Sequence, residues 1–138
     1  MTDHQHEHGV LDTSAVILRA ELTDPGALPR LPTITAITLA ELTVGPLVAT
    51  SEAQRAIRLG HRQQAEADFD PLPFDAEVAR VFGQVAASMR QAGRKANART
   101  YDGLIAATAL AHGLPLYTAN PDGFAGIDGL LVVPVSVR

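Results

Sequence analysis

Short apolar stretches alternate along this chain with longer segments in which apolar residues recur at helical spacing. The clearest repeat, at positions i, i+3, i+4, i+7, i+8 and i+11, consists of Val78, Val81, Phe82, Val85, Ala86 and Met89. Because these positions share one face of a helix, the spacing predicts an amphipathic helix whose Met and Phe side chains belong to the core. Asp75 stands where it can cap this helix.

Four further helices are expected from apolar content and end signals, over residues 13–20, 38–44, 51–67 and 100–111. Ser51 and Gln54 match a capping box at the start of the third of these. Gly45-Pro46 bends or ends the second, and Gly113 closes the last.

The short apolar stretches are typical of strands, and they cover residues 9–11, 33–36, 116–118 and 130–133. Residues 70–74 could form only a short strand, because two prolines there remove hydrogen-bond donors. Strands separated by helices imply right-handed crossovers, which build a parallel sheet covered on both faces. We therefore expect an α/β fold, a three-layer α/β/α sandwich around a central parallel sheet of four to five strands.

Composition changes this picture little. The 138 residues, 46% of them hydrophobic, suffice for one domain with its own core, and we assign residues 9–138 to it. Residues 1–8 are polar with alternating histidines, so a flexible tail is expected there. No apolar run approaches the roughly 20 residues of a membrane helix, and the first residues do not match an export signal. The absence of cysteine agrees with a cytoplasmic protein and excludes thiolate metal sites and thiol nucleophiles.

Four acidic residues stand at the ends of predicted elements. Asp12 follows the first strand, Glu41 lies in the helix over 38–44, Asp102 begins the helix over 100–111, and Asp122 is in the turn after the strand over 116–118. Ligands of parallel sheets bind at the carboxyl ends of the strands, so we expect one acidic pocket there. Clustered carboxylates raise each other's pKa, which a cation relieves. Oxygen ligands without cysteine favour Mg²⁺, with Mn²⁺ as a substitute, and leave open whether one ion or two are bound.

Each acid also has a purely structural explanation. Asp12 could only cap a helix, Asp102 could only complement a helix dipole, and Glu41 could face solvent. Asp122 belongs to Asn120-Pro121-Asp122-Gly123, which is also a good turn sequence, so its case is the weakest.

Basic residues are concentrated just before Asp102. The net charge is −4, which argues against nonspecific coating of nucleic acid, yet the short segment before this acid holds Arg90, Arg94, Lys95 and Arg99. Such a run is often only a solvated face. Its position beside a candidate site favours phosphate contact by Arg94, Lys95 and Arg99.

The segments around the four acids resemble those of the PIN-domain nucleases. They read Val10-Leu11-Asp12-Thr13-Ser14, Leu39-Ala40-Glu41-Leu42, Tyr101-Asp102-Gly103-Leu104-Ile105-Ala106-Ala107-Thr108-Ala109 and Leu116-Tyr117-Thr118-Ala119-Asn120-Pro121-Asp122. Residues 9–135 as a whole resemble the VapC toxins of bacterial type II toxin–antitoxin pairs. The resemblance implies a PIN-like fold and a cytoplasmic, Mg²⁺-dependent endoribonuclease that cleaves structured RNA such as tRNA or rRNA. It also implies a VapB-like antitoxin, a homodimer, and a heterotetramer or larger complex with the antitoxin.

The resemblance assigns roles residue by residue. Asp12, Glu41 and Asp102 match the three metal-binding acids of the family. Gly123 replaces an acid that many relatives carry before the phenylalanine, so Asp122 or Asn120 is expected to complete the metal shell. The side chains expected to orient these carboxylates are those of Thr13, Thr118 and Asn120.

Two other classes of function stay open from the residues alone. A DNA nuclease or phosphatase could use the same metals, although Ser14 stands where aspartyl-phosphate hydrolases carry a second aspartate. A protein-binding module with a degenerate site is the other alternative, and retention of three acids counts against it. For a partner, the helices over residues 13–20 and 38–67 offer apolar side chains such as Ile57 and Leu59 among polar ones.

Overall fold

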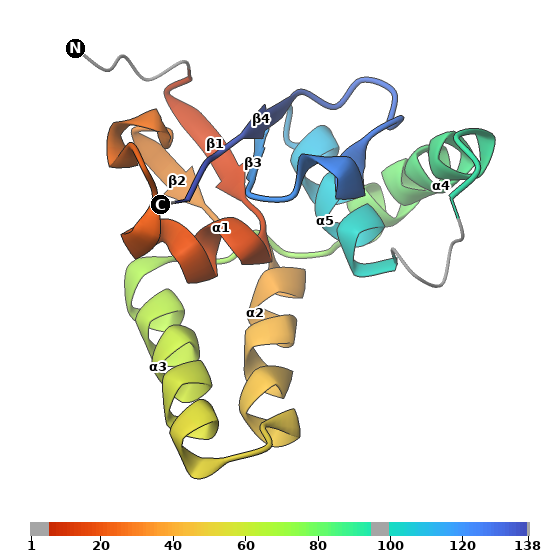
Figure 1. Cartoon of the computed structure of the whole chain (residues 1–138). Coiled ribbons are helices and arrows are strands. Elements are labelled where there is room, and N and C mark those ends of the chain that lie inside the picture. The colour runs from red at the N-terminus through yellow and green to blue at the C-terminus, as the bar shows by residue number, and fades with distance from the viewer. Residues whose placement is uncertain (1–5, 95–99, 138) are drawn as a thin grey trace.

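The computed structural model describes residues 6–94 and 100–137, in which four parallel strands form one sheet in the order β2-β1-β3-β4 (Figure 1). The strands are β1 (His8–Leu11), β2 (Leu31–Thr33), β3 (Leu116–Thr118) and β4 (Val132–Pro134). In the register, Val10 of β1 lies opposite Thr33 on one side and Leu116 on the other. Because all four strands run in one direction, their carboxyl ends meet at one edge of the sheet.

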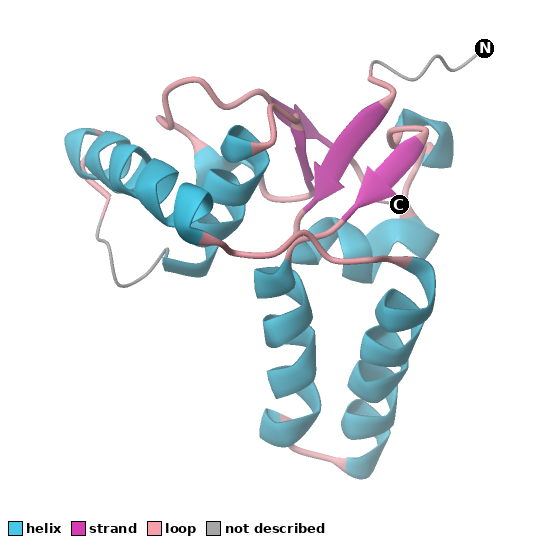
Figure 2. Ribbon diagram, turned by 180° about the vertical axis from the view of Figure 1, so that it is seen from behind, coloured by secondary structure: helices cyan, strands magenta, loops and turns pink. Residues whose placement is uncertain are grey.

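In the described part of the chain, five α-helices connect and cover the strands: α1 (Thr13–Leu18), α2 (Ala36–Val44), α3 (Glu52–Asp68), α4 (Ala76–Gln91) and α5 (Thr100–Ala111). Helices α2 and α3 form an antiparallel pair that projects away from the sheet, joined by the 3₁₀ helix η3 (Gly45–Val48) (Figures 1 and 2). Helices α4 and α5 pack against each other as a second pair. No helix in residues 6–94 and 100–137 is long and apolar enough to cross a membrane.

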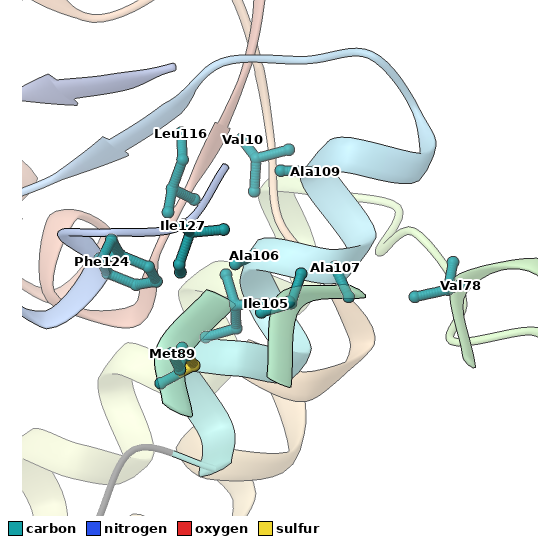
Figure 3. Packing of buried hydrophobic residues seen from close by; sticks show 11 residues of the cluster. Val10, Val78, Met89, Ile105, Ala106, Ala107, Ala109, Leu116, Phe124 and Ile127 are labelled. Carbon is teal, nitrogen blue, oxygen red and sulfur yellow. The ribbon is translucent and has the colours of Figure 1, made fainter. Parts of the chain in front are cut away.

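The two faces of the sheet belong to two separate hydrophobic clusters. Successive residues of a strand point to opposite faces. Val10 and Leu116 accordingly join the cluster with Ile105 and Val85 from α5 and α4, part of which Figure 3 shows. The second cluster contains Leu11, Ala15, Val16, Leu22, Ile34, Leu42, Ala65, Tyr117 and Val135. The sheet is thus covered on both faces, which confirms the expected three-layer α/β/α architecture.

Helix α4 agrees closely with its predicted repeat. Asp75 is its N-cap and accepts a hydrogen bond from the Val78 backbone N–H at 3.0 Å, while Val78, Val85 and Met89 are buried. Helix α1 is shorter than the predicted residues 13–20, because the chain tightens after Leu18 into the 3₁₀ helix η1 (Arg19–Glu21). Ile57 of α3, one of the apolar side chains expected to be offered to a partner, is exposed.

The sequence pattern predicts the second strand over residues 33–36, and this placement is wrong. The strand is β2, and Thr35 is instead the N-cap of α2, with its hydroxyl accepting from the Thr38 N–H at 3.1 Å. A β-branched residue that suits a strand is thus used as a cap, and α2 begins two residues earlier than the sequence indicates. Residues 70–74 hold only an isolated bridge at Leu72, and β4 is displaced to Val132–Pro134 from the predicted 130–133.

Candidate active site

Asp12 sits where β1 meets α1, and its carboxylate is held from three directions. Its Oδ1 accepts from the Ala15 backbone N–H at 2.8 Å and from the Ser14 hydroxyl at 2.7 Å, and its Oδ2 accepts from the Thr118 hydroxyl at 2.5 Å. Asp12 is only 5% exposed. Burial raises the pKa of Asp12, and the bonds from Thr118, Ala15 and Ser14 act in the opposite direction.

The pairing of β1 with β3 brings Thr118 to Asp12, since the Asp12 N–H donates to the Tyr117 carbonyl at 3.0 Å. Thr118 also accepts from the Asn120 N–H at 2.9 Å, and Ser14 accepts from the Ala119 N–H at 3.1 Å. The turn after β3 is therefore tied to the first acid through two hydroxyls. Asn120 itself is exposed, and the hydrogen bonds that the structure shows for it, to the Thr118 hydroxyl and from the Gly123 N–H, are made by its backbone.

Glu41 reaches the same sheet edge from α2. The Thr13 hydroxyl, just after Asp12, lies 2.7 Å from Glu41 Oε1 and 3.0 Å from the Thr38 hydroxyl. Burial raises the pKa of Glu41, and the charges of Asp102 and Asp12 raise it further against the Thr13 bond. Glu41 is therefore within electrostatic reach of both Asp12 and Asp102.

Asp102 is half-buried in the first turn of α5. The next residue, Gly103, is fully packed: a Cβ there would stand 3.1 Å from Phe82 Cε1 and 3.3 Å from Met89 Sδ, both on α4. The glycine thus allows α5 to lie close against α4, and this packing fixes the position of Asp102.

Asp122 lies apart from the other acids in its contacts. It is exposed in the 3₁₀ helix η5 (Pro121–Phe124), and its charge is not among the causes that raise the pKa of Asp12 or Glu41. Its backbone carbonyl accepts a hydrogen bond from the Arg94 guanidinium. Arg94 therefore joins the end of α4 to η5, while Lys95 and Arg99 lie outside the described residues.

The donor set fits a hard divalent cation. In the described ranges no three acidic or histidine side chains stand together at metal-binding distance, so the side chains do not by themselves form a closed cage. Asp12 and Glu41 nevertheless offer carboxylate oxygens that burial and like charge make costly to ionise, and a cation would offset that cost. Oxygen ligands of this kind suit Mg²⁺ or Mn²⁺.

A cavity of about 280 Å³ opens beside Glu41, between α1, α2 and α3. Its lining includes Thr13, Ile17, Glu41, Leu42, Arg58 and His61. The sequence alone assigns no site role to Arg58 or His61, because only the packing of α3 against α2 brings them to Glu41. Nor does it assign one to Ser14, although its place two residues after Asp12 is a local signal that could have identified its bond to the carboxylate.

Comparison with known proteins shows a consistent pattern. The chain matches the PIN domain family over residues 10–130. It is 36% identical over 129 residues to Ribonuclease VapC5 of Mycobacterium tuberculosis, covering 92% of this chain and 93% of that protein. It is 33% identical over 105 residues to Ribonuclease VapC1 of Rickettsia felis, covering 76% and 77%.

Solved structures agree with the sequence relatives. A crystal structure of VapBC-5, a member of the VapBC family of toxin–antitoxin systems from Mycobacterium tuberculosis, superposes with a TM-score of 0.79 at 38% identity. The match covers 95% of this chain and 99% of that one. FitAcB from Neisseria gonorrhoeae matches with a TM-score of 0.67 at 29% identity, covering 89% and 94%.

Proposed function

The chain belongs to the PIN domain family, and from this membership we propose that it is a Mg²⁺-dependent endoribonuclease toxin of the VapC kind, acting on structured RNA such as tRNA or rRNA. The observation that carries the proposal is the meeting of Asp12 and Glu41 at the carboxyl-end edge of the sheet. There Thr13, which follows Asp12, donates to Glu41 at 2.7 Å, and the charges of Asp102 and Asp12 raise the pKa of Glu41. Relatives over most of the chain are named ribonucleases, which supports RNA as the substrate. The proposal also places the protein in the cytoplasm, with which the absence of cysteine agrees.

Asp12, Glu41 and Asp102 would hold the metal, with Asp122 or Asn120 as the candidate that completes its shell. A bound divalent ion supplies water activation and stabilises the charge that develops on the phosphate. The chain's own residues hold the ligands in place: Thr118 and Ser14 orient Asp12, and Thr13 orients Glu41. Mn²⁺, which shares the preference for oxygen ligands, would substitute.

Binding of RNA near this acidic site requires positive charge, because the RNA phosphates and the carboxylates repel each other. The proposal places phosphate contacts on the segment of Arg94, Lys95 and Arg99 that leads into Asp102. Arg94 supports this only in part, because its guanidinium already donates to the Asp122 carbonyl.

The proposal of protein partners rests on the matched relatives and on exposed apolar side chains. Matched structures are described as toxin–antitoxin complexes, so we infer a VapB-like antitoxin, a homodimer, and a heterotetramer or larger assembly of the two proteins. The apolar surface that the antitoxin would cover lies on α1, α2, η3 and α3 and consists of Ile17, Val44, Leu47, Val48 and Ile57. We call these five residues the apolar strip.

The central test is sequencing of RNA ends after brief expression of the wild-type chain and of Asp12→Asn, Glu41→Gln and Asp102→Asn variants. We expect discrete new RNA ends with the wild type and a reduction of at least about 100-fold in each variant, since even residues that only orient metal ligands contribute about 10–100-fold. Near-wild-type cleavage in two of the three variants would reject the assignment of the metal site.

The alternative functions are distinguished by assays on the purified wild-type protein. Cleavage of DNA, or release of phosphate from a monoester, in preference to RNA would favour the nuclease or phosphatase alternative. Absence of any Mg²⁺ or Mn²⁺ binding by calorimetry would favour a degenerate binding module.

A further inference from the structure

The cavity beside Glu41 is lined by three kinds of side chain. Thr13 and Glu41 contribute the polar and acidic groups of the proposed metal site, and Ile17 and Leu42 contribute apolar ones. Helix α3 contributes Arg58 and His61. An acidic group, a cation and apolar side chains therefore line one space.

Arg58 is fixed in place and keeps its charge available. Its Nη1 donates to the carbonyl of Gly45 at 3.0 Å, at the end of α2, where the helix dipole favours a cation. Among the described residues, no acidic side chain forms an ion pair with Arg58, although Arg19, Arg55 and Arg62 on neighbouring turns or elements each have one. A guanidinium has five N–H donors, so most of its capacity is left for a ligand.

His61 follows Arg58 by three residues, which places both side chains on the same face of α3. An imidazole can donate a hydrogen bond to a phosphate oxygen or a ribose hydroxyl. His61 also lines a second, smaller cavity with Ile17 and Arg19.

We propose that this cavity binds one nucleotide of the RNA substrate adjacent to the phosphodiester that is cleaved. Arg58 and His61 contact its phosphate, and Ile17 and Leu42 lie against its base or ribose. The inference rests on the proposed ribonuclease function, and it assigns to that function a binding site for the neighbouring nucleotide. Holding this nucleotide positions the next phosphate at Asp12, Glu41 and Asp102, where restricting its freedom before the reaction lowers the barrier.

A nucleotide suits this lining because it combines a charged phosphate with a flat base, and the sugar separates the two. The phosphate would neutralise the charge of Arg58, which forms no ion pair with Glu41. A carboxylate of a partner protein is the competing ligand for Arg58, and binding measurements on matched variants separate the two.

The test compares Arg58→Gln with Arg55→Gln, both in an Asp12→Asn background that does not cleave. Arg55 lies on the same helix, one turn earlier, but pairs with Glu52 at 2.8 Å and does not line the cavity. The probe is a fluorescein-labelled pool of single-stranded 12-nucleotide RNAs of random sequence, in buffer with EDTA. We expect binding to weaken about tenfold with Arg58→Gln, the effect of removing one charged hydrogen bond, and to change less than about twofold with Arg55→Gln.

Two further measurements keep the result interpretable if Arg58→Gln destabilises the fold. His61→Gln removes a cavity residue for which the structure shows no hydrogen bond within the described chain, and it should also weaken RNA binding. In methyl NMR of the Asp12→Asn protein, the four nucleoside 5′-monophosphates, added singly, should shift the Ile17 methyl signals and leave those of the buried Ile105 in place.

Equal RNA binding by the Arg58→Gln and Arg55→Gln variants, or unmoved Ile17 signals with all four nucleotides, overturns the inference. So does an Arg58→Gln effect confined to antitoxin binding, which would make the cavity a protein contact. Cleavage of cellular RNA by the wild-type chain is measured in parallel. Its absence rejects the proposed function itself, and its presence together with either negative result rejects only the nucleotide site.

Discussion

Asp12 illustrates how one side chain serves both folding and the proposed chemistry. It caps α1 through the Ala15 N–H and is almost completely buried, yet burial raises its pKa above the ordinary value of 3.8. The pKa of Glu41, ordinarily 4.5, is raised as well, by burial and by the charges of Asp102 and Asp12. In the metal-free protein these two carboxyls therefore keep their protons to a higher pH than ordinary carboxyls do.

This gives a pH prediction for the metal-free protein. A group whose pKa is higher in the folded state stabilises the fold fully below its unfolded pKa, about pH 4 here, and that contribution disappears as pH rises through the folded value. We expect the free energy of unfolding in EDTA to fall as pH rises through the raised pKa values of Asp12 and Glu41. Urea unfolding at a series of pH values measures it, and an Asp12→Asn/Glu41→Gln variant should show a smaller decline. An equal decline in both proteins would contradict the prediction.

Thr118 provides a second prediction at this scale. Its hydroxyl donates to Asp12 and accepts from the Asn120 N–H, so Thr118→Val keeps the shape and removes both bonds. We expect stability to fall by about 1–3 kcal/mol, because buried polar groups are left unpaired, and cleavage to fall about 10–100-fold. Thr118→Ser retains the hydroxyl and should recover most of both. If Thr118→Val cleaves RNA like the wild type, the hydroxyl does not orient Asp12.

Asp12, Glu41 and Asp102 could be proposed from sequence because the pattern places Asp12 after a strand, Asp102 at the start of a helix, and Glu41 among apolar residues of a short helix. The hydroxyl groups that bind these carboxylates were harder to predict. Thr118 could be matched to Asp12 only by the resemblance, since the bond depends on the register of β1 against β3, which no local pattern gives. Arg58 and His61 depend on the packing of two helices, and the sequence alone does not assign them to the site.

At the scale of elements, prediction succeeded where a repeat was long. Helix α4, with three buried residues at helical spacing and an Asp cap, was placed almost to the residue. Strand β2 was displaced because three residues are too few to show a period, and Thr35 suits a strand and a helix cap equally well.

The apolar strip predicts a partner contact on the α2–α3 pair. Leu47 is 77% exposed and Ile57 62% exposed, so these side chains contribute little to the core of the isolated chain. Leu47→Ser with Ile57→Lys should abolish copurification of a coexpressed antitoxin and leave the melting temperature nearly unchanged. Leu131→Ser, at another exposed apolar residue outside the strip, is the matched control. Undiminished copurification with the double variant would exclude the strip.

The segment between α4 and α5 carries another prediction. If it binds RNA phosphates, Arg94→Ala with Arg99→Ala should make the slope of log affinity against log salt shallower, by roughly 0.7 to 0.9 for each phosphate that is no longer neutralised. Arg94→Ala alone should also lower the melting temperature, because it removes the bond to the Asp122 carbonyl. RNA binding to the Asp12→Asn protein at several salt concentrations measures the slope. A lower melting temperature with an unchanged slope would leave Arg94 a purely structural role.

At the scale of the whole molecule, the alternation of strands and helices was enough to predict a parallel sheet covered on both faces and a site at its carboxyl edge. What it could not provide is how closely the helices pack against one another. Gly103 is an example, because it allows α5 to lie close against Phe82 and Met89 of α4, and local pattern does not reveal which helix lies beside α5.

Assembly is the prediction that belongs to the molecule as a whole. Exposed apolar side chains occur outside the apolar strip as well, among them Leu31, Tyr101 and Leu131. Apolar surface of this kind suits an interface between identical chains. Light scattering at micromolar concentrations should therefore give the mass of a homodimer. A monomer mass throughout that range would reject it.

The bond between Thr118 and Asp12 joins residues 106 positions apart, and this separation has a consequence for synthesis of the protein. On a translating ribosome, the amino-terminal part of the chain emerges long before Thr118 has been added. Strand β3 lies between β1 and β4, so the nascent chain cannot complete either its sheet or the support of Asp12 until then. If the chain is the ribonuclease proposed above, it would thus stay inactive while most of it is being synthesised, and a chain that ends before Thr118 would lack the support of Asp12.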